Sequence, residues 1–230
     1  METLFNGYTL DIAPGTFPLS TDSMALADFA RLPRNSEVLD LGSGCGTIGV
    51  LLCAKDEKCR VTGIELDENA HKMALENITR NHLESRLNSI CTDLTTIPEL
   101  LPPGSFDVCV SNPPYFTSGK LSQTVPGARH ELSCPLDALM RSAGWALKYG
   151  GDFYLVHKPE RLAELFVSAA DAKLEPKRLC LLRHRPAGPV ALVLLQLRKG
   201  GKPGLVWEDL ILNDADGNPS DAYKRIYHHI

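Results

Sequence analysis

The chain has 230 residues, of which 43% are hydrophobic and 23% charged, and its formal net charge is −4. This composition predicts one globular domain and excludes a membrane-spanning protein, because no apolar run approaches the roughly 18 residues of a membrane helix. The negative charge also excludes a protein that holds nucleic acid mainly through its overall field. The seven cysteines form no C-x-x-C pair, so we expect neither a zinc site nor a disulfide framework.

The first 36 residues predict a small appendage before the core. Residues 1–6 lack the basic-then-apolar pattern of a signal peptide, and we therefore expect a cytoplasmic protein. The stretch Leu4–Leu10 resembles a hairpin in which Asn6-Gly7 suits a type I′ turn. Ser20-Thr21-Asp22 then offers N-caps for an apolar-faced helix.

From residue 37 onward, strand-like and helix-like segments alternate. The expected strands are Val38–Leu41, Val61–Leu66, Leu87–Thr92, Phe106–Ser111 and Phe153–His157. The expected helices are Thr47–Ala54, Glu68–Asn81, Pro135–Tyr149 and Glu160–Ala170. This alternation predicts βαβ units around a parallel sheet with helices on both faces.

The C-terminal third departs from that rhythm. Arg178–Leu182 and Val190–Leu197 are strand-like runs with no room for a helix between them, so we expect an antiparallel hairpin. Leu205–Leu212 is a candidate for another strand, and Ser220–Tyr227 for a terminal helix. The predicted fold class is α/β, with a seven-stranded, mostly parallel sheet and a reversed last strand. We expect one domain over 1–230, with a catalytic core at 37–200 between N- and C-terminal extensions (1–36 and 201–230).

A glycine-rich loop follows the first core strand. Gly42, Gly44 and Gly46 allow positive φ and a close approach of the backbone to a ligand. Their amides and the next helix N-terminus suit the carboxylate of S-adenosylmethionine (SAM). Asp40 is placed to accept from the ligand's ammonium and Glu65 from its ribose hydroxyls. Asp93 is a candidate acceptor for the adenine amine, although a solvated turn aspartate is an equal alternative.

A dinucleotide site is the rival interpretation of this loop. Gly44–Gly49 also satisfies G-x-G-x-x-G, and Glu65 lies at a dinucleotide-like distance. In dinucleotide folds, however, the first glycine usually leaves the strand directly, with no acidic residue two positions earlier. The loop therefore favours SAM over NAD, with a purely structural βα turn as the remaining alternative.

Asn112-Pro113-Pro114-Tyr115 follows an apolar strand and predicts a clamp for a planar amino group. The Asn112 side-chain oxygen and the Pro113 carbonyl can accept from the two N–H bonds of an amine. The prolines hold that geometry rigidly. Carbonyl dipoles stabilise the positive charge that develops on nitrogen, and Tyr115 offers a face for stacking a base. The alternative is a plain turn after a strand.

These motifs resemble those of class I SAM-dependent methyltransferases with an Asn-Pro-Pro-Tyr motif. The resemblance runs over Leu39–Gly46, Gly63–Glu65 and Asn112–Phe116. The stretches Phe17–Asp22, Ala128–Glu131, Val156–Arg161 and Lys199–Gly204 make the whole chain similar to the bacterial tRNA(Val) adenine N6-methyltransferase family. The resemblance implies a Rossmann-like fold and clamp roles for Asn112, Pro113 and Tyr115. It also implies that Asp40, Gly42, Gly44, Glu65 and Asp93 bind SAM, with Thr21 and Asp22 closing over its methionine end.

The length of the chain narrows the substrate. Enzymes that methylate glutamine in release factors usually carry a helical domain upstream, and residues 1–36 are too few for one. Duplex-DNA methyltransferases generally need a target-recognition region, whereas an RNA loop presents bases already unpaired. We expect methylation of the N6 amine of an adenosine in a tRNA anticodon loop; the resemblance implies the adenosine 3′ of the anticodon in a valine tRNA. The alternatives are N5-glutamine methylation of a translation protein, N6-adenine methylation of rRNA or DNA, NAD-dependent redox chemistry, and SAM or nucleotide binding without catalysis.

Phe116 and Arg129 are the candidate substrate-binding residues next to the clamp. Basic residues also gather in the C-terminal third, where they either contact phosphates or simply protect a strand edge. They are Lys177, Arg178, Arg183, His184, Arg185, Arg198, Lys199 and Lys202. His228-His229 has no partners that would suggest a metal site, so no metal is expected.

Overall fold

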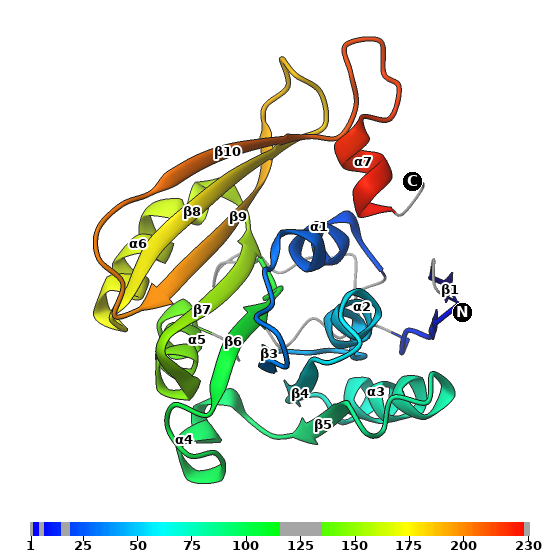
Figure 1. Cartoon of the computed structure of the whole chain (residues 1–230), viewed down its shortest axis with the longest axis vertical. Helices are drawn as coiled ribbons and strands as arrows, with labels where there is room; N and C mark the ends of the chain where they lie inside the picture. Colours follow the sequence, from blue (N-terminus) through cyan, green and yellow to red (C-terminus); the bar gives the residue numbers. More distant parts are fainter. Residues whose placement is uncertain (1, 5–6, 15–18, 116–134, 228–230) are drawn as a thin grey trace.

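An eight-stranded sheet forms the centre of the molecule (Figure 1). The computed structural model describes residues 2–4, 7–14, 19–115 and 135–227. In spatial order, the strands are β10 (Val206–Ile211), β8 (Leu174–Arg183), β9 (Val190–Lys199), β7 (Leu147–His157), β6 (Phe106–Ser111), β3 (Glu37–Leu41), β4 (Arg60–Glu65) and β5 (Leu87–Cys91).

Strand β9 is the reversed strand of this sheet. It runs antiparallel to both neighbours, β7 and β8, whereas the pairs from β7 through β6, β3 and β4 to β5 are parallel. The mostly parallel sheet with an antiparallel C-terminal hairpin is therefore confirmed. Strand β10 adds an eighth strand, parallel to β8, beyond the seven expected. The β8–β9 hairpin consequently does not form the sheet edge, because β10 covers it.

Helices cover both faces of the sheet (Figure 1). One face carries α1 (Thr21–Phe29), α2 (Thr47–Lys55) and α3 (Glu68–Arg80), and the other α4 (Ile97–Leu100), α5 (Leu136–Ala146) and α6 (Leu162–Asp171). Strand β3 is buried on both sides. Val38 packs into the cluster beneath α1 and α2, while Leu39 and Leu41 join the cluster on the face of α5 and α6. Because side chains alternate along a strand, Asp40 points to the same face as Val38.

Local sequence signals account for most helix ends. The Ser20 hydroxyl accepts from the Ser23 amide at the start of α1, and the Asp67 carboxylate accepts from the Ala70 amide at the start of α3. The helix expected over Pro135–Tyr149 ends earlier, at Ala146. From Leu147 the chain pairs with Phe106 as the first residue of β7, so sheet pairing overrides the helical pattern there.

The N-terminal hairpin is present as β1 (Glu2–Thr3) paired with β2 (Thr9–Leu10). The Gly7 amide donates to the Leu4 carbonyl, and Gly7 itself has a φ of +83°. Asn6 lies outside the described residues. The Asn81 carboxamide of α3 accepts from the Thr9 amide at 2.7 Å and donates to the Thr9 carbonyl at 2.7 Å. These two bonds hold the hairpin against α3.

The C-terminal helix α7 (Asp221–Ile226) lies beside α1. Arg225 forms a salt bridge to Asp28 near the end of α1, with an Nη2–Oδ2 distance of 3.1 Å. The Tyr227 hydroxyl lies 2.6 Å from the Thr21 hydroxyl at the start of α1. The last described turn of the chain is thus bonded to both ends of α1.

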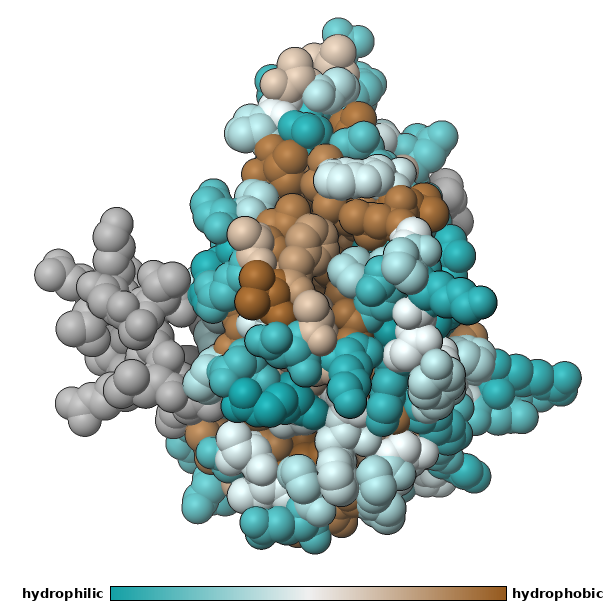
Figure 2. Space-filling model, turned by 90° about the vertical axis from the view of Figure 1, so that its left-hand side faces the viewer, coloured by the Kyte–Doolittle hydropathy of each residue, from teal (hydrophilic) through white to brown (hydrophobic). Residues whose placement is uncertain are grey.

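Apolar side chains gather on the side of the molecule where α6 and β10 lie, between hydrophilic regions (Figure 2). Val167 of α6 and Val206 and Trp207 of β10 each expose more than half of their surface. Among the described residues, no helix is both long and apolar enough to cross a bilayer.

Candidate active site

The two motifs singled out from the sequence lie at the same edge of the sheet. The glycine-rich loop leaves the end of β3, and Asn112 follows the end of β6. Strands β3 and β6 are parallel neighbours, and the Ser111 hydroxyl at the end of β6 donates to the Leu41 carbonyl at the end of β3 (2.7 Å). Because the carboxyl ends of parallel strands meet at one edge, the loop and the clamp are brought together.

The glycine loop turns through three residues with positive φ: Gly42 (+74°), Gly44 (+56°) and Gly46 (+80°). A β-carbon built on Gly42 or Gly44 would meet no atom within 4 Å, so the backbone conformation, rather than crowding, requires glycine there. Gly46 is the N-cap of α2 and provides no side-chain acceptor. The first amides of α2 therefore have no side-chain cap, as a helix N-terminus that receives an anion requires.

Asp40 is fully buried beneath this loop. Neither carboxylate oxygen has a hydrogen-bond partner among the described residues, and the lowering effect of the Gly49 amide on the pKa of Asp40 is smaller than the raising effects of burial and of Glu65. Burial, with a smaller contribution from the charge of Glu65, raises the pKa of Asp40 to about 8. A buried carboxyl group without a partner is costly, and it is satisfied most readily by a cationic donor.

Glu65, at the end of β4, contacts the glycine loop directly. Its Oε2 accepts from the Gly44 amide at 2.7 Å, and its Oε1 accepts from the Asp67 amide at 2.8 Å. Strand β4 comes this close because Gly63 has no side chain: a β-carbon there would lie 2.6 Å from the Ser43 hydroxyl oxygen. Asp40, the loop and Glu65 therefore form one continuous group.

Asp93 has a local structural task. Its Oδ1 accepts from both the amide and the hydroxyl of Thr95, at 2.8 Å each, and so caps the short 3-10 helix Leu94–Thr96. Asp93 follows β5, two strands away from β3. The capping role agrees with the turn aspartate kept as an alternative from the sequence.

The clamp residues are joined to one another by side-chain hydrogen bonds. The Tyr115 hydroxyl lies 2.8 Å from Asn112 Oδ1 and 2.6 Å from Asp22 Oδ2. A hydroxyl has one proton, so Tyr115 can donate to only one of these oxygens at a time. On its other side, the Asn112 carboxamide donates from Nδ2 to the Ser23 hydroxyl at 3.0 Å. Burial, reinforced by Asp22, raises the pKa of Tyr115 above its usual value.

The start of α1 therefore lies against the clamp. Asp22 and Ser23 both contact clamp residues, whereas Thr21 is bonded to Tyr227 of the C-terminal segment. Both Thr21 and Asp22 were expected near the methionine end of SAM. Asp22 contacts Tyr115, whereas Thr21 helps to hold α1 in place. Pro113 is buried and Pro114 exposed. Phe116 and Arg129 lie outside the described residues.

Three residues near the clamp received no role from the sequence: Ser23, His157 and Lys158. The ring of His157, at the end of β7, meets the Tyr115 ring edge-on with centroids 5.2 Å apart. Its Nδ1 accepts from the Lys158 amide, and burial is the main cause that lowers the pKa of His157 to about 4. The Lys158 ammonium lies 5.3 Å from the centre of the Tyr115 ring. His157 and Lys158 belong to the stretch Val156–Arg161 noted in the sequence, whereas no local pattern marks Ser23.

The basic residues of the C-terminal third mostly have internal partners. Arg178 forms a two-fold hydrogen bond with Glu208 and packs over the Phe29 ring, and Arg198 forms one with Asp152. Arg183, Lys177 and Lys199 each donate to a backbone carbonyl. Because β10 and β7 flank this hairpin, its basic residues do not line a sheet edge. Most of them are held in structural contacts rather than on a phosphate-binding surface.

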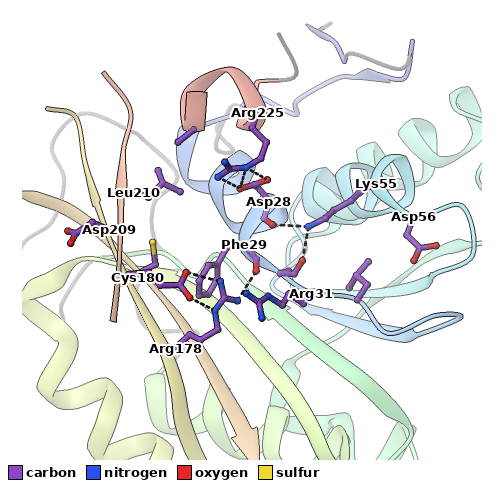
Figure 3. A pocket seen from close by; sticks show the side chains of 14 residues that line it. Asp28, Phe29, Arg31, Lys55, Asp56, Arg178, Cys180, Asp209, Leu210 and Arg225 are labelled. Atoms are coloured by element: carbon purple, nitrogen blue, oxygen red, sulfur yellow. Dashed lines mark hydrogen bonds and ion pairs between the residues drawn. The ribbon is translucent and has the colours of Figure 1, made fainter. Parts of the chain in front are cut away.

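A cavity of about 580 Å³ lies between α1, α7 and the strands β8 and β10 (Figure 3). Several of its charged groups have partners: Lys55 donates to three carbonyls at the end of α1, Arg225 pairs with Asp28, and Arg178 pairs with Glu208. These interactions join α1 to α2 and α7, and β8 to β10, and Arg178 also donates to the Phe29 carbonyl of α1 at 3.3 Å. The cavity contains none of the residues of the glycine loop or the clamp.

Comparison with known proteins identifies the family. Residues 19–170, more than half of the chain, match the model of the methyltransferase small domain. The chain is 31% identical to a tRNA1(Val) (adenine(37)-N6)-methyltransferase from Shewanella halifaxensis, over 78% of this chain and 74% of that protein. It is 29% identical to the enzyme of the same name from Vibrio parahaemolyticus, over 97% and 92% of the two chains.

Solved structures show the same fold. A crystal structure described as a predicted O-methyltransferase from Agrobacterium tumefaciens aligns with a TM-score of 0.76 and 21% identity, over 90% of this chain and 96% of that one. At that identity, the likeness concerns the Rossmann-like fold alone. The family model and the sequence relatives show that the chain belongs to the methyltransferase small domain family and, within it, to the family of tRNA1(Val) adenine N6-methyltransferases.

Proposed function

We propose that this protein transfers a methyl group from SAM to the N6 amine of an adenosine in tRNA. The observation that carries the proposal is the position of Asn112 and Tyr115 beside the glycine loop, at the carboxyl ends of two adjacent parallel strands. A donor cradle and an amino-group clamp at one sheet edge are what direct methyl transfer to nitrogen requires.

The residues of the cradle fit SAM by charge and by shape. Among the described residues, the buried carboxyl group of Asp40 has no hydrogen-bond partner and no side chain caps α2. The Asp40 carboxyl group suits the ammonium of the methionine moiety, and the N-terminus of α2 suits its carboxylate. Gly42, Gly44 and Gly46 leave three positions of the loop without a side chain. Glu65 supplies carboxylate oxygens for the ribose hydroxyls. In this proposal Thr21, Asp22 and Asp93 complete the cofactor site at its periphery.

The clamp residues bind the acceptor amine and make its nitrogen more nucleophilic. An adenine amine is a poor nucleophile because its lone pair is delocalised into the ring. The Asn112 Oδ1 and the Pro113 carbonyl accept its two N–H bonds, favour a pyramidal nitrogen, and stabilise the positive charge that develops on it. Pro114 holds the turn rigid, and Tyr115 supplies an aromatic face for the base. SAM, when bound, supplies an electrophilic methyl group on a sulfonium.

The substrate proposal rests on the relatives. Both relatives described above are named as methylating adenine 37 of tRNA1(Val). We extend this substrate to the present chain, and with it a cytoplasmic site of action. Phe116 and Arg129 follow the clamp closely in the sequence and remain our candidates for contact with the RNA.

The test is a methylation assay with paired acceptors. Purified protein and labelled SAM are incubated with a valine tRNA, with the same tRNA carrying guanosine at position 37, and with a release factor. We expect N6-methyladenosine, identified by mass spectrometry of the nucleosides, only in the first sample. Label on the release factor with none on RNA would transfer the proposal to glutamine methylation, and label on both tRNAs alike would refute position 37.

A further inference from the structure

Ser23 is the residue that contacts the far side of the Asn112 carboxamide. Its hydroxyl oxygen accepts from Asn112 Nδ2 at 3.0 Å, although the two residues are 89 positions apart in the sequence. Ser23 retains only 6% of its exposure and lies in the first turn of α1. The hydrogen bond is therefore held by a capped helix rather than by a free surface side chain.

A carboxamide must face its substrate with the correct edge. Its oxygen accepts from an amine, whereas its NH2 group is a donor and opposes the N–H bonds of that amine. A half-turn about the last side-chain bond exchanges the two edges at almost no steric cost. The clamp therefore needs a partner that favours the orientation with oxygen toward the substrate.

Tyr115 does not provide that preference. Its single proton is shared between Asp22 Oδ2 at 2.6 Å and Asn112 Oδ1 at 2.8 Å. When the proton lies on the carboxylate side, the Tyr115 oxygen offers only lone pairs to Asn112, which favours the NH2 edge turned toward Tyr115. The acceptor on the opposite side of the carboxamide then has to counter this tendency.

We infer that Ser23 is a positioning residue, which binds the NH2 of Asn112 and so directs its oxygen to the acceptor amine. The inference rests on the proposed function and deepens it, by assigning a part of the clamp to α1. Ser23 itself touches neither the methyl group nor the nucleophile. Its loss should therefore reduce the rate of the chemical step without changing the binding of either substrate.

The experiment compares steady-state kinetics of wild type, Ser23→Ala, Ser23→Cys and Ser20→Ala on the valine tRNA. Ser20→Ala is the matched control, since it removes a hydroxyl from the same helix start without touching Asn112. We expect Ser23→Ala to lower kcat roughly ten-fold, the effect of one hydrogen bond, with KM for SAM and for tRNA unchanged. Its loss of Tm should be no larger than that of Ser20→Ala, which also removes one hydrogen bond. Ser23→Cys preserves the volume with a weaker acceptor and should give an intermediate kcat, whereas Ser20→Ala should leave kcat within two-fold.

Each other result counts against the inference. A kcat within two-fold of wild type for Ser23→Ala would show that the orientation is fixed without Ser23. A fall in kcat accompanied by a larger loss of Tm than in Ser20→Ala, or by raised KM values, in both Ser23 variants, would indicate a general role in folding α1. If the wild-type protein does not methylate tRNA at all, the proposed function fails. If the wild type is active and Ser23→Ala keeps its kcat, only this inference fails, so the two failures are distinguishable.

Discussion

The hydroxyl of Tyr115 lies 2.8 Å from the side-chain oxygen of Asn112, so two residues assigned to separate tasks on the amino group are in direct contact. The same hydroxyl is 2.6 Å from Asp22 at the start of α1. The clamp is therefore part of a hydrogen-bonded group that includes α1, whose Asp22 lies 93 residues before Tyr115 in the sequence. Substitutions within this group and in the SAM site should separate three roles: stacking of the base, acceptance of the amine N–H bonds, and binding of SAM.

Asn112→Ala should lower kcat by about 10²–10³-fold, the usual cost of removing one acceptor or donor that stabilises charge in a transition state. The affinity for SAM, measured by calorimetry, should stay within a few-fold because Asn112 lies outside the glycine loop. Asn88→Ala, an exposed asparagine on β5, is the control. Joint loss of turnover and SAM affinity would contradict the assigned role.

Tyr115→Phe and Tyr115→Ala distinguish the ring from the hydroxyl. Phenylalanine keeps the aromatic face and removes the contacts to Asp22 and Asn112, so we expect kcat/KM within a few-fold of wild type. Alanine removes the stacking face, worth about 1–3 kcal/mol, and should lower kcat/KM by roughly 10- to 100-fold. Equal losses in both variants would assign the role to the hydroxyl instead.

Glu65→Gln should weaken SAM binding by about ten-fold or more, because a charge-assisted pair of hydrogen bonds becomes a neutral one. The change keeps the side-chain volume but leaves one oxygen instead of two to accept from the Gly44 and Asp67 amides, so the Tm without ligand should also fall. Isothermal calorimetry with SAM gives the dissociation constant, and Glu68→Gln on the exposed start of α3 serves as the control. Unchanged SAM affinity in Glu65→Gln would remove this residue from the cofactor site.

Asp40 should make the unfolding free energy depend on pH. Its pKa is raised from 3.8 to about 8 in the folded chain, so the folded state holds a proton that the unfolded state loses above about pH 4. The folded state thus binds more protons between these two values, and the free energy of unfolding falls as pH rises from about 4 to 8. Asp40→Asn should flatten this part of the profile.

Urea unfolding of wild type and Asp40→Asn at pH 5, 6.5 and 8 measures this difference. Glu57→Gln, an exposed acid near the end of α2, is the control. Parallel pH profiles for wild type and Asp40→Asn would mean that Asp40 is ionised throughout.

Arg178→Met tests the account of the basic residues. Its side chain is only 12% exposed in its salt bridge with Glu208, so losing the hydrogen bonds and leaving Glu208 without this partner should cost about 1–3 kcal/mol of stability. Affinity for tRNA, measured by filter binding, should not change. A loss of tRNA affinity with unaltered stability would return Arg178 to the RNA-binding surface.

Much of the fold follows from the sequence because its signals are local. Ser20 and Asp67 mark helix starts, the apolar runs mark the core strands, and the absence of a helix between β8 and β9 predicts their antiparallel pairing. The predicted end of α5 at Tyr149 was wrong, because the pairing of Leu147 with Phe106 is a contact between distant segments. The eighth strand was visible only as a candidate, since its partner β8 lies some thirty residues earlier.

The site divides in the same way. Most site residues lie at strand ends or directly after them, and the topology of a parallel sheet brings strand ends together. They are Asp40, the three glycines, Glu65 and Asn112. Ser23 reaches Asn112 only through the packing of α1 on the sheet, and no periodicity marks that contact. The partners of Arg178 and Arg198 were hidden for the same reason: Glu208 and Asp152 are 30 and 46 residues away in sequence. Charge composition alone therefore exaggerated the basic surface.

The hydrogen bond between Thr21 and Tyr227 links two segments that are 206 residues apart in the sequence, at a point one residue from Asp22. A premature stop codon that deletes only the final twenty residues would spare every motif by which the enzyme is recognised. Such a shortened product would nonetheless lose the contacts of α7 with α1, and the defect should emerge as misaligned chemistry at the neighbouring clamp, which Asp22 and Ser23 contact. Gene products of this kind would still look complete to a motif search.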